Sequence, residues 1–462
     1  RRENPEVQEI AFDSSLMEMA TIHRADDREY AAVKGAPERV IGQCRGVDRE
    51  AWSAIADDMS GDGLRVLAVA RRPIEVKEGA VLQPDDVYRD LELVGLVGLR
   101  DPARAEIADV IASCQSAGIS VAMVTGDNAR TARAIGLEVG IIEDESAPIV
   151  SGSEIDDYLE SGQQAEEAQI FARVTPAQKL SIVDWYQERG EIVAMTGDGV
   201  NDAPALERAD IGVAMGERGT DVAAESSDMV LTDDALGSIL TAVKYGRTIF
   251  TNIRKFVVYL MSCNLAEIIA VGVAAVAALP LPLLPLQILF LNVVTGVFPA
   301  LALGVGPGSG DVMAQPPRDP ASPVLERRHW TALIAFSLLI ATAVMTAFLI
   351  ALGPLDIGAD GAVTVGFLTL AFAQVWHVFN MRGRGSTWYK NDITVNPWVW
   401  GAIGLCIALV VGAATIPGLS GILSLVRIPP GGWLLSLGAS MLPLLAGPAV
   451  VRLASPNHVY QW

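Results

Sequence analysis

The chain has 462 residues, which is too long for one ordinary domain and indicates about three structural units. It combines a hydrophobic fraction of 51% with 54 acidic residues and a net charge of −20. This charge argues against a nucleic-acid partner, because phosphate binding needs a basic surface. Four scattered cysteines without a CxxC pair indicate neither a disulfide framework nor a zinc site.

Charged and apolar residues are segregated along the chain. Residues 1–235 hold most of the charge, whereas residues 250–452 hold long apolar runs. We therefore expect a soluble part, which the cysteine usage marks as cytosolic, followed by a membrane part. No signal peptide opens the chain, and it starts at Arg1 with sequence typical of a domain interior. We expect it to be a fragment of a longer protein.

Short apolar strands alternate with helical stretches between residues 91 and 234, as in a parallel α/β sheet. Strands are predicted at 93–99, 120–124 and 192–195, and Asp101-Pro102 is expected to open a helix after the first. The second strand ends in TGDN at 125–128 and the third in TGDGVND at 196–202. Ligands of open α/β sheets bind at the carboxyl ends of strands, so both turns are candidate sites.

The residue types in and near these two turns suit phosphoryl transfer. Glycines let the backbone approach a phosphate, Thr125 offers hydroxyl and amide donors, and Lys179 offers a positive charge. Asp198 and Asp202 can hold a magnesium ion. A single TGD triplet could equally be a structural turn. Two such turns at strand ends, with a lysine upstream of the second, favour a phosphate site.

Six stretches have the roughly 20 apolar residues that a bilayer-spanning helix needs. A proline-rich turn, LPLPLLP at 279–285, separates the first two. Basic residues concentrate before the first span, between the second and third, and between the fourth and fifth, so these ends are predicted to be cytoplasmic. The spans are predicted at 254–278, 285–304, 331–352, 361–380, 398–416 and 432–452.

Three of these spans carry polar residues at one-turn spacing, and hence on one helix face. A central charge in a span costs about 2.5–3.5 kcal/mol on insertion scales, so such residues tend to be functional. Their oxygens suit a hard cation. The alternative, that they only join helices, fits His377 and Asn380 better than Glu267. The predicted ligands of a transported cation are Asn264, Glu267, Asn292, Thr295 and Gln374.

Several motifs resemble those of type II P-type ATPases, and the resemblance covers essentially the whole chain. TGDGVNDAPAL at 196–206, ADIGVAMG at 209–216 and GTDVAAESSDMVL at 219–231 resemble the family's hinge signature. DPAR at 101–104, MVTGDN at 123–128 and FARVTPAQK at 171–179 match other motifs of its phosphorylation domain.

The resemblance implies three domains and a phosphorylation site. A partial α+β nucleotide-binding domain at 1–88 precedes a haloacid-dehalogenase-like α/β phosphorylation domain at 89–235. An all-α transmembrane cation-transport domain with six helices follows at 236–462. By similarity, the aspartyl phosphate and its magnesium ion are surrounded by Thr125, Gly126, Asp127, Lys179, Asp198, Asn201 and Asp202, with Asp198 as the magnesium ligand.

The resemblance also implies a nucleotide pocket. KGAPE at 34–38 is similar to the family's adenine-pocket lysine motif, and GLRVL at 63–67 places an arginine on the other side of the nucleotide. From the residues alone, Phe12 could equally be a core aromatic rather than a partner of adenine. The family often has a lysine where this chain has Met17, so we expect no ATP contact there. The implied nucleotide-binding residues are Phe12, Lys34, Gly35, Arg65 and Arg173.

Other family motifs are missing from the chain. It contains no DKTGT motif, which would carry the nucleophilic aspartate, and no TGE loop of an actuator domain. The resemblance also implies that the first four membrane helices are absent. We therefore expect that this chain alone does not turn over ATP.

Six spans and no CPC motif argue against the heavy-metal class of pump. NIRKFVVYLMSCNLAE at 252–267 and PLQILFLNVVTGVFPALALG at 285–304 resemble calcium pumps, but Gly296 stands where their NxxTD aspartate is expected. A site for two calcium ions is therefore not expected.

The function implied first is ATP-driven cation transport through an aspartyl phosphate, most simply calcium-type export. The alternatives are a type II pump for sodium, potassium, protons or manganese, and a non-transporting hydrolase-like domain on a membrane anchor. The resemblance implies Mg²⁺ and ATP as cofactors, a transported metal cation and the lipid bilayer as partners, and no obligate protein partner. It places the protein in the plasma membrane, with the soluble domains and both ends of the chain cytoplasmic.

Overall fold

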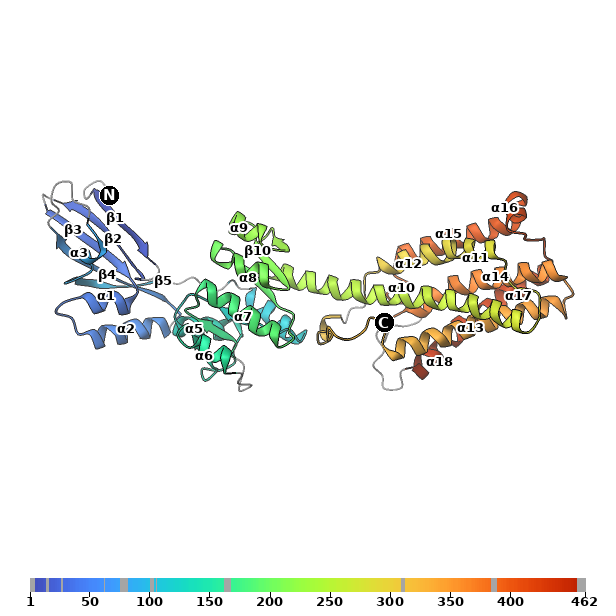
Figure 1. Ribbon diagram of the computed structural model, residues 1–462, viewed down its shortest axis with the longest axis horizontal. Coiled ribbons are helices and arrows are strands. Elements are labelled where there is room, and N and C mark those ends of the chain that lie inside the picture. The colour runs from blue at the N-terminus through green and yellow to red at the C-terminus, as the bar shows by residue number, and fades with distance from the viewer. Residues whose placement is uncertain are drawn as a thin grey trace. The chain divides into compact units, whose positions relative to one another are not determined.

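The computed structural model describes residues 5–13, 16–25, 28–61, 63–74, 82–99, 104, 106–161, 168–308, 312–383 and 389–454. Its contacts divide the chain into two compact units, Arg1–Leu240 and Thr241–Trp462. Figure 1 shows strands and short helices in the first unit and long helices in the second.

The first unit opens with a five-stranded antiparallel sheet in the order β1-β2-β3-β4-β5. Its strands alternate buried and exposed residues, as β4 does with Val66, Ala68 and Ala70 on the buried face. The core under this sheet includes Val40 and Ile41 of the helix α1. The elements are β1 (Glu6–Asp13), β2 (Glu18–Ala25), β3 (Arg28–Gly35), α1 (Pro37–Gln43), α2 (Arg49–Gly61), β4 (Arg65–Ile74), α3 (Pro84–Val87) and β5 (Glu92–Leu99).

The strand predicted at 93–99 exists as β5, but its expected place in a parallel sheet is wrong. It pairs antiparallel with β4, with Leu67 opposite Val97, and completes the first sheet. Its apolar sequence, LVGLVGL, does not distinguish the two environments, because both kinds of sheet accept a strand of small and branched residues. The helix opening expected at Asp101-Pro102 lies outside the described residues, and so do residues 101–103 of the DPAR motif.

Two parallel sheets of three strands follow among the described residues, where the sequence predicted one. Their orders are β6-β8-β7 and β11-β10-β9, so β6 and β9, which precede the two TGD turns, are both edge strands. The elements are α4 (Ile107–Ser116), β6 (Met123–Val124), α5 (Ala129–Val139), β7 (Ile149–Ser151), α6 (Ile155–Glu160), β8 (Ile170–Ala172), α7 (Pro176–Glu188), β9 (Ala194–Gly197), α8 (Ala203–Arg208), β10 (Ile211–Met215), α9 (Asp221–Glu225) and β11 (Met229–Leu231).

Local signals position the helices beside these turns. Asn128 caps α5 by accepting hydrogen bonds from the N–H groups of Arg130 and Thr131, each at 3.0 Å. Thr175 and Gln178 form a capping box at the start of α7, where Pro176 occupies the first turn. Helix α5 therefore begins directly after the TGDN turn, and α7 begins inside the FARVTPAQK motif.

The second unit contains six helices, among the described residues, that are long and apolar enough to cross a membrane. The prediction of six spans is confirmed, although the first helix begins well before its apolar stretch and has 40 residues. The spans are α10 (Gly237–Val276), α11 to α12 (Pro285–Gly304), α13 (Arg327–Leu352), α14 with its last turn (Ala359–Met381), α15 (Pro397–Thr415) and α17 with α18 (Pro430–Val450).

Two features of this helical unit matter for a site. The second span is interrupted by a π-helical segment at Asn292–Val297, between α11 (Pro285–Leu291) and α12 (Phe298–Gly304). Such segments alter the backbone hydrogen bonds and occur often at functional sites. The fourth span is central, since 83% of its apolar stretch is buried, against 28–50% in the others.

Candidate functional site

The first TGD turn is held by its own side chains and by the segment at 170–174. The N–H of Asp127 donates to Thr125 Oγ1 at 3.1 Å, and Thr125 Oγ1 lies 3.4 Å from Asp127 Oδ2. The N–H of Val174 donates to Thr125 O at 3.0 Å, and that of Arg173 donates to Asp127 O at 2.9 Å. This turn is therefore anchored to the FARVTPAQK segment.

The second turn is organised by Asp202, whose side chain is 9% exposed. Its Oδ2 accepts hydrogen bonds from the N–H groups of Asp198 at 3.3 Å and Gly199 at 3.2 Å. Gly197 must be a glycine here, because a Cβ atom would lie 2.5 Å from Asp202 Cβ. Asp198 and Asn201 remain exposed. Asp202 therefore shapes the turn, whereas Asp198 is accessible to a ligand.

Lys179 of α7 connects the second turn to the same segment. Its Nζ lies 2.5 Å from Asp202 Oδ1, and its side chain is 18% exposed. Charge-assisted hydrogen bonds of this length are the strong ones. The segment 171–179 therefore makes hydrogen bonds to both 125–127 and 196–202.

The candidate nucleotide residues differ in how the structure presents them. Phe12 lies on β1 at the edge of the antiparallel sheet with 61% of its surface exposed, so it does not join the core formed by the described residues. Lys34 is also exposed. Gly35 is buried, and a Cβ atom there would lie 2.6 Å from Met17 O. The N–H of Ala36 donates to Met17 O at 3.0 Å, so Met17 contributes its backbone to this turn.

Two arginines bring the nucleotide motifs to the first TGD turn. The Nε of Arg65 lies 4.0 Å from Asp127 Oδ1, and the Arg65 side chain is 73% exposed. Arg173 forms an ion pair with Glu38 of the KGAPE motif. The Arg65 guanidinium is therefore near the strand-end turn, whereas Arg173 contacts the turn through its backbone N–H and the KGAPE motif through its side chain.

A magnesium ion fits this set of donors. It commonly binds one or two carboxylates together with phosphate oxygens and water. Asp198 offers an exposed carboxylate, while Asp202 is already paired with Lys179. No group of three or more His, Cys, Asp or Glu side chains suited to a metal occurs among the described residues. The donors here therefore suit a magnesium ion that arrives with a phosphate ligand.

In the helical unit, Glu267 lies in a buried polar cluster. Gln374 Nε2 donates to Glu267 Oε1 at 2.9 Å, and Thr295 Oγ1 hydrogen-bonds to Gln374 Oε1. All three residues are buried: Glu267 is 3% exposed, Gln374 is 1% exposed and Thr295 is 0% exposed. They come from α10, the π-helical segment and α14, so three spans meet at this cluster.

The other two candidate ligands do not join the cluster. Asn264 is exposed on α10, and Asn292 is half-buried with no side-chain hydrogen bond among those of the described residues. Gly296 is buried, and a Cβ atom there would meet Leu260 Cδ2 at an ordinary 3.5 Å. Position 296, where the family's aspartate is expected, therefore has room for the Cβ atom of a larger residue.

Sequence reasoning missed three groups that the structure brings forward. The Tyr259 hydroxyl donates to Thr295 O at 2.6 Å and lies 3.2 Å from Gln374 O. Asp234 accepts backbone hydrogen bonds from Gly216, Glu217 and Arg218. Lys255 and Asp392 form an ion pair whose side chains are 2% and 8% exposed. For Tyr259, the one available signal in the sequence was its position about two helical turns before Glu267 on the same helix.

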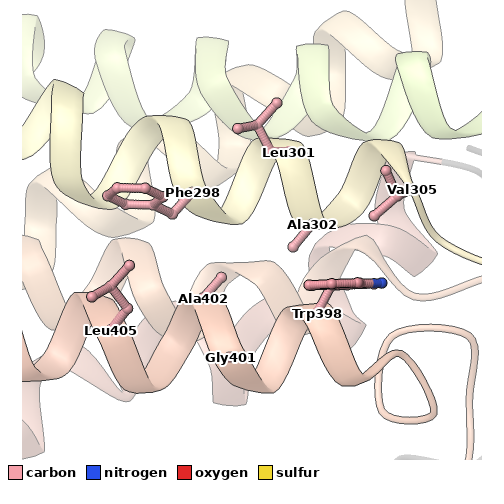
Figure 2. Close-up of a pocket in the computed structure, with 8 residues that line it drawn as sticks. All are labelled: Phe298, Leu301, Ala302, Val305, Trp398, Gly401, Ala402 and Leu405. Atoms are coloured by element: carbon pink, nitrogen blue, oxygen red, sulfur yellow. The ribbon is translucent and has the colours of Figure 1, made fainter.

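The apolar groove in Figure 2 is a different kind of feature. It lies between α12 and α15, and no lining side chain offers an oxygen donor, so it does not fit a cation. It is lined by Phe298, Leu301, Ala302, Val305, Trp398, Gly401, Ala402 and Leu405.

Comparison with known proteins gives matches at both ends of the chain. Residues 1–106 match the family model "P-type ATPase, cytoplasmic domain N", and residues 280–453 match "Cation transporting ATPase, C-terminus". A "Calcium-transporting ATPase" of Bacillus subtilis is 40% identical over 96% of this chain and 52% of its own length.

Two further relatives have related names. "Calcium-transporting ATPase 1" of Bacillus cereus is 36% identical over 98% of this chain and 53% of its own length. "Probable cation-transporting ATPase F" of Mycobacterium tuberculosis is 38% identical over 86% of this chain and 45% of its own length. The chain spans about half the length of the curated relatives that it matches.

The six apolar helices, together with the preceding α/β unit, define a multi-pass membrane protein. With both family models and relatives that cover nearly the whole chain, it belongs to the P-type cation-transporting ATPases.

Proposed function

We propose that this chain is the part of a P-type pump that binds ATP, completes the phosphorylation site and holds the transported cation, most simply in calcium-type export. The observation that carries the proposal is the joining of both TGD turns by one segment, through Val174, Arg173 and Lys179. That arrangement gathers a lysine, two carboxylates and glycine backbone at strand ends, as phosphoryl transfer requires.

The phosphorylation domain is proposed to be haloacid-dehalogenase-like and to end near 235. Its start lies after β5 rather than near 89, because β5 (Glu92–Leu99) belongs to the first sheet. Both strands that lead into the TGD turns, β6 and β9, are edge strands and offer backbone groups to a further strand. A strand from the remainder of the protein, carrying the nucleophilic aspartate of a DKTGT segment, would complete the sheet at these edges. This accounts for the two short sheets where one was expected.

Each charged residue has a role in the proposed transfer of the γ-phosphoryl group. Lys34, Arg65 and Arg173 bind the nucleotide, whose adenine stacks on Phe12. Thr125 and the backbone of Gly126 donate to the phosphoryl oxygens, and Lys179 offsets the negative charge that develops on them. Asp202 holds Lys179 in place. Asp198 would hold a magnesium ion, which neutralises phosphate charge when bound.

The transported cation is proposed to bind at the Glu267 cluster. A carboxylate in an apolar span must be protonated, paired or bound to a cation, and no basic side chain lies within 256–304 to pair with it. Gln374 and Thr295 offer two further oxygens once the amide of Gln374 turns its Oε1 toward the ion. Asn264 and Asn292 would join only after a rearrangement, or with helices outside this chain.

The ion remains a choice among candidates. The names of two relatives support calcium, and that of a third names only a cation. Gly296 removes a carboxylate from the family's pattern, which favours one ion over two and keeps sodium, potassium, protons or manganese as alternatives. A non-transporting hydrolase on a membrane anchor is disfavoured by the buried carboxylate at a three-helix junction. We propose the plasma membrane as the location, with the soluble domains and both chain ends cytoplasmic.

The test is phosphoenzyme formation from ATP labelled at the γ-phosphate, in the intact protein and across a panel of cations. Asp198→Asn should abolish the phosphoenzyme while leaving ATP binding largely intact. Glu191→Gln, an exposed acid ahead of the same strand, is the matched control. Normal phosphoenzyme in Asp198→Asn would refute the assigned role, and a wild-type protein that no cation stimulates would refute the transport function.

A further inference from the structure

The fourth span carries a fully buried histidine that the proposed function leaves without a role. His377 is 0% exposed, and its Nε2 has no hydrogen-bond partner among the described residues. It lies one turn after Gln374 on α14, and Asn380 follows it at the same spacing. Buried polar atoms normally have partners, so an imidazole in this position needs an explanation.

Three side chains fix the orientation of the imidazole. The ring of Tyr259 stacks on it, with centroids 5.7 Å apart and planes at 19°. Phe336 of α13 packs edge-on, with centroids 4.7 Å apart and planes at 61°. Asn380 Nδ2 lies 3.1 Å from His377 Nδ1 and donates to Pro443 O of α18, also at 3.1 Å. The imidazole ring is therefore held by the aromatic rings of Tyr259 and Phe336 from two other helices and by the side-chain amide of Asn380.

The contacts favour a neutral ring with a mechanical role. Because the Asn380 amide group is a donor, Nδ1 acts as the acceptor, and the ring proton then lies on Nε2. Among the described residues, the ring and hydrogen-bond contacts of His377 come from Tyr259 of α10, Phe336 of α13 and Asn380 of the turn after α14, and none of these is a carboxylate. Stacked and edge-on aromatic contacts are directional, so they can fix the position of a neighbour.

The imidazole ring supports Tyr259, whose hydroxyl contacts two backbone carbonyl groups of the Glu267 cluster. It donates to Thr295 O at 2.6 Å and lies 3.2 Å from Gln374 O. Thr295 belongs to the π-helical segment, and Gln374 is the residue whose amide binds Glu267. Two of the three cluster residues therefore take their backbone position from a tyrosine that rests against His377.

We propose that His377 is a positioning residue for the cation site: its ring supports Tyr259, which holds Thr295 and Gln374 at the spacing that the cation needs. His377 does not touch the ion. The proposal rests on the proposed function of the Glu267 cluster and deepens it, because it names a determinant of affinity outside the ligands.

The test compares Ca²⁺-dependent ATP hydrolysis of His377 variants in the intact protein. His377→Ala removes the support and should raise the half-saturating Ca²⁺ concentration about fivefold to tenfold, the upper part of the range for one aromatic contact, with less than a twofold change in maximal rate. His377→Phe keeps a flat ring against Tyr259 and should restore the affinity to within about twofold. His377→Asn replaces the alanine variant if the latter does not fold.

The control is Phe372→Ala, which deletes another buried aromatic ring from α14. It should lower the melting temperature without changing the half-saturating Ca²⁺ concentration. An equal shift in this control would mean that His377 acts only through core packing, and would overturn the proposal. A His377→Phe variant as impaired as His377→Ala would also overturn it, because the imidazole nitrogens would then be required.

A double-mutant cycle checks that His377 acts through Tyr259. Tyr259→Phe removes the hydroxyl and its two carbonyl contacts, so His377→Ala should have little further effect on affinity in that background. Additive effects would refute the pathway. If Glu267→Gln leaves the Ca²⁺ dependence unchanged, the cluster itself is not the site. If Glu267→Gln abolishes it while His377→Ala does nothing, only the present inference fails.

Discussion

The strand-end site of the first unit and the Glu267 cluster of the second solve the same problem, the binding of a charged ligand, in opposite ways. At the strand ends, charges are matched, in the largely buried pair of Lys179 with Asp202 and in the exposed contact of Arg65 with Asp127. In the helices, one carboxylate that is 3% exposed is held by the neutral amide of Gln374.

The difference follows from the cost of burying charge. Where water reaches the side chains, charge is inexpensive, several groups can share a role, and the loss of one is graded. Among apolar helices a charge is costly, so few are present and each is decisive. The backbone also contributes differently. The strand-end site uses N–H groups of a glycine turn, whereas the helical site uses side chains around an altered helical turn.

The largest effect is expected at Glu267, the carboxylate of the buried cluster. Glu267→Gln should eliminate cation-stimulated ATPase activity in the intact protein, because no other acid lies in the cluster. Asp360→Asn, an exposed acid at the start of α14, is the control and should be neutral. Normal activity at saturating cation in Glu267→Gln would break the comparison and place the site elsewhere. Gly296→Asp should shift ion preference or stoichiometry toward calcium pumps, since its Cβ fits beside Leu260.

At the strand ends the expected effect is large but incomplete. Lys179→Met should slow phosphoenzyme formation by roughly 10²–10³, as the loss of one stabilising donor does elsewhere. Arg71→Gln, which breaks an exposed ion pair with Glu92, should leave the rate unchanged. Rapid-quench measurement of phosphoenzyme formation in both variants tests this prediction. Complete loss in Lys179→Met with unfolded protein would point to a structural role for its pair with Asp202, which Lys179→Arg should then rescue.

The buried pair of Lys255 and Asp392 tests the cost of charge in the second unit directly. Lys255→Met leaves the Asp392 carboxylate buried without its counter-charge, with the N–H of Gly383 still donating to it at 2.9 Å, and should cost about 3–5 kcal/mol of stability. Lys255→Met with Asp392→Asn should recover most of that loss, because no unpaired charge remains. Thermal unfolding of the purified protein in detergent measures both. If the double variant is no more stable than the single one, burial of charge is not the cause.

A modest effect is expected at the adenine. Phe12→Ala should weaken ATP binding by about twofold to tenfold, the range for one aromatic contact. Val7→Ala changes another exposed residue of the same edge strand and serves as the control. Lys34→Ala should add a comparable loss that grows weaker at high salt. Unchanged nucleotide titrations in both variants would remove these residues from the pocket.

The smallest effect concerns a tyrosine of the first unit. Burial, with the charges of Glu18 and Asp13 acting in the same direction, raises the pKa of Tyr88 from 10.0 to about 12. Its hydroxyl has no partner among the described residues. Below pH 10 the neutral form contributes its full stability. Between pH 10 and about 12 the unfolded chain ionises this tyrosine while the folded chain does not, so stability falls as pH rises. Tyr88→Phe should show a shallower alkaline fall in chemical unfolding.

Local features were readable from the sequence alone. The six spans follow from apolar length, the two TGD turns from the strands that precede them, and the starts of α5 and α7 from capping residues and Pro176. The family motifs led to the correct family, because they are long stretches of specific residues. Each of these signals lies within about 20 neighbouring residues, which is why no tertiary information was needed.

What the tertiary structure decided concerns pairs far apart in the chain. The sequence of the strand at 92–99 is compatible with either a parallel or an antiparallel sheet, and only its pairing with β4 shows that it belongs to the first, antiparallel sheet. Asn264 and Glu267 share a helix face by spacing, yet one is exposed and the other buried, because the neighbouring helices cover only part of that face. Lys255 meets Asp392 across 137 residues, and Tyr259 meets Gln374 across 115. Periodicity is a property of one helix, whereas these contacts depend on which helices pack together, and that is determined by the summed packing of the whole unit.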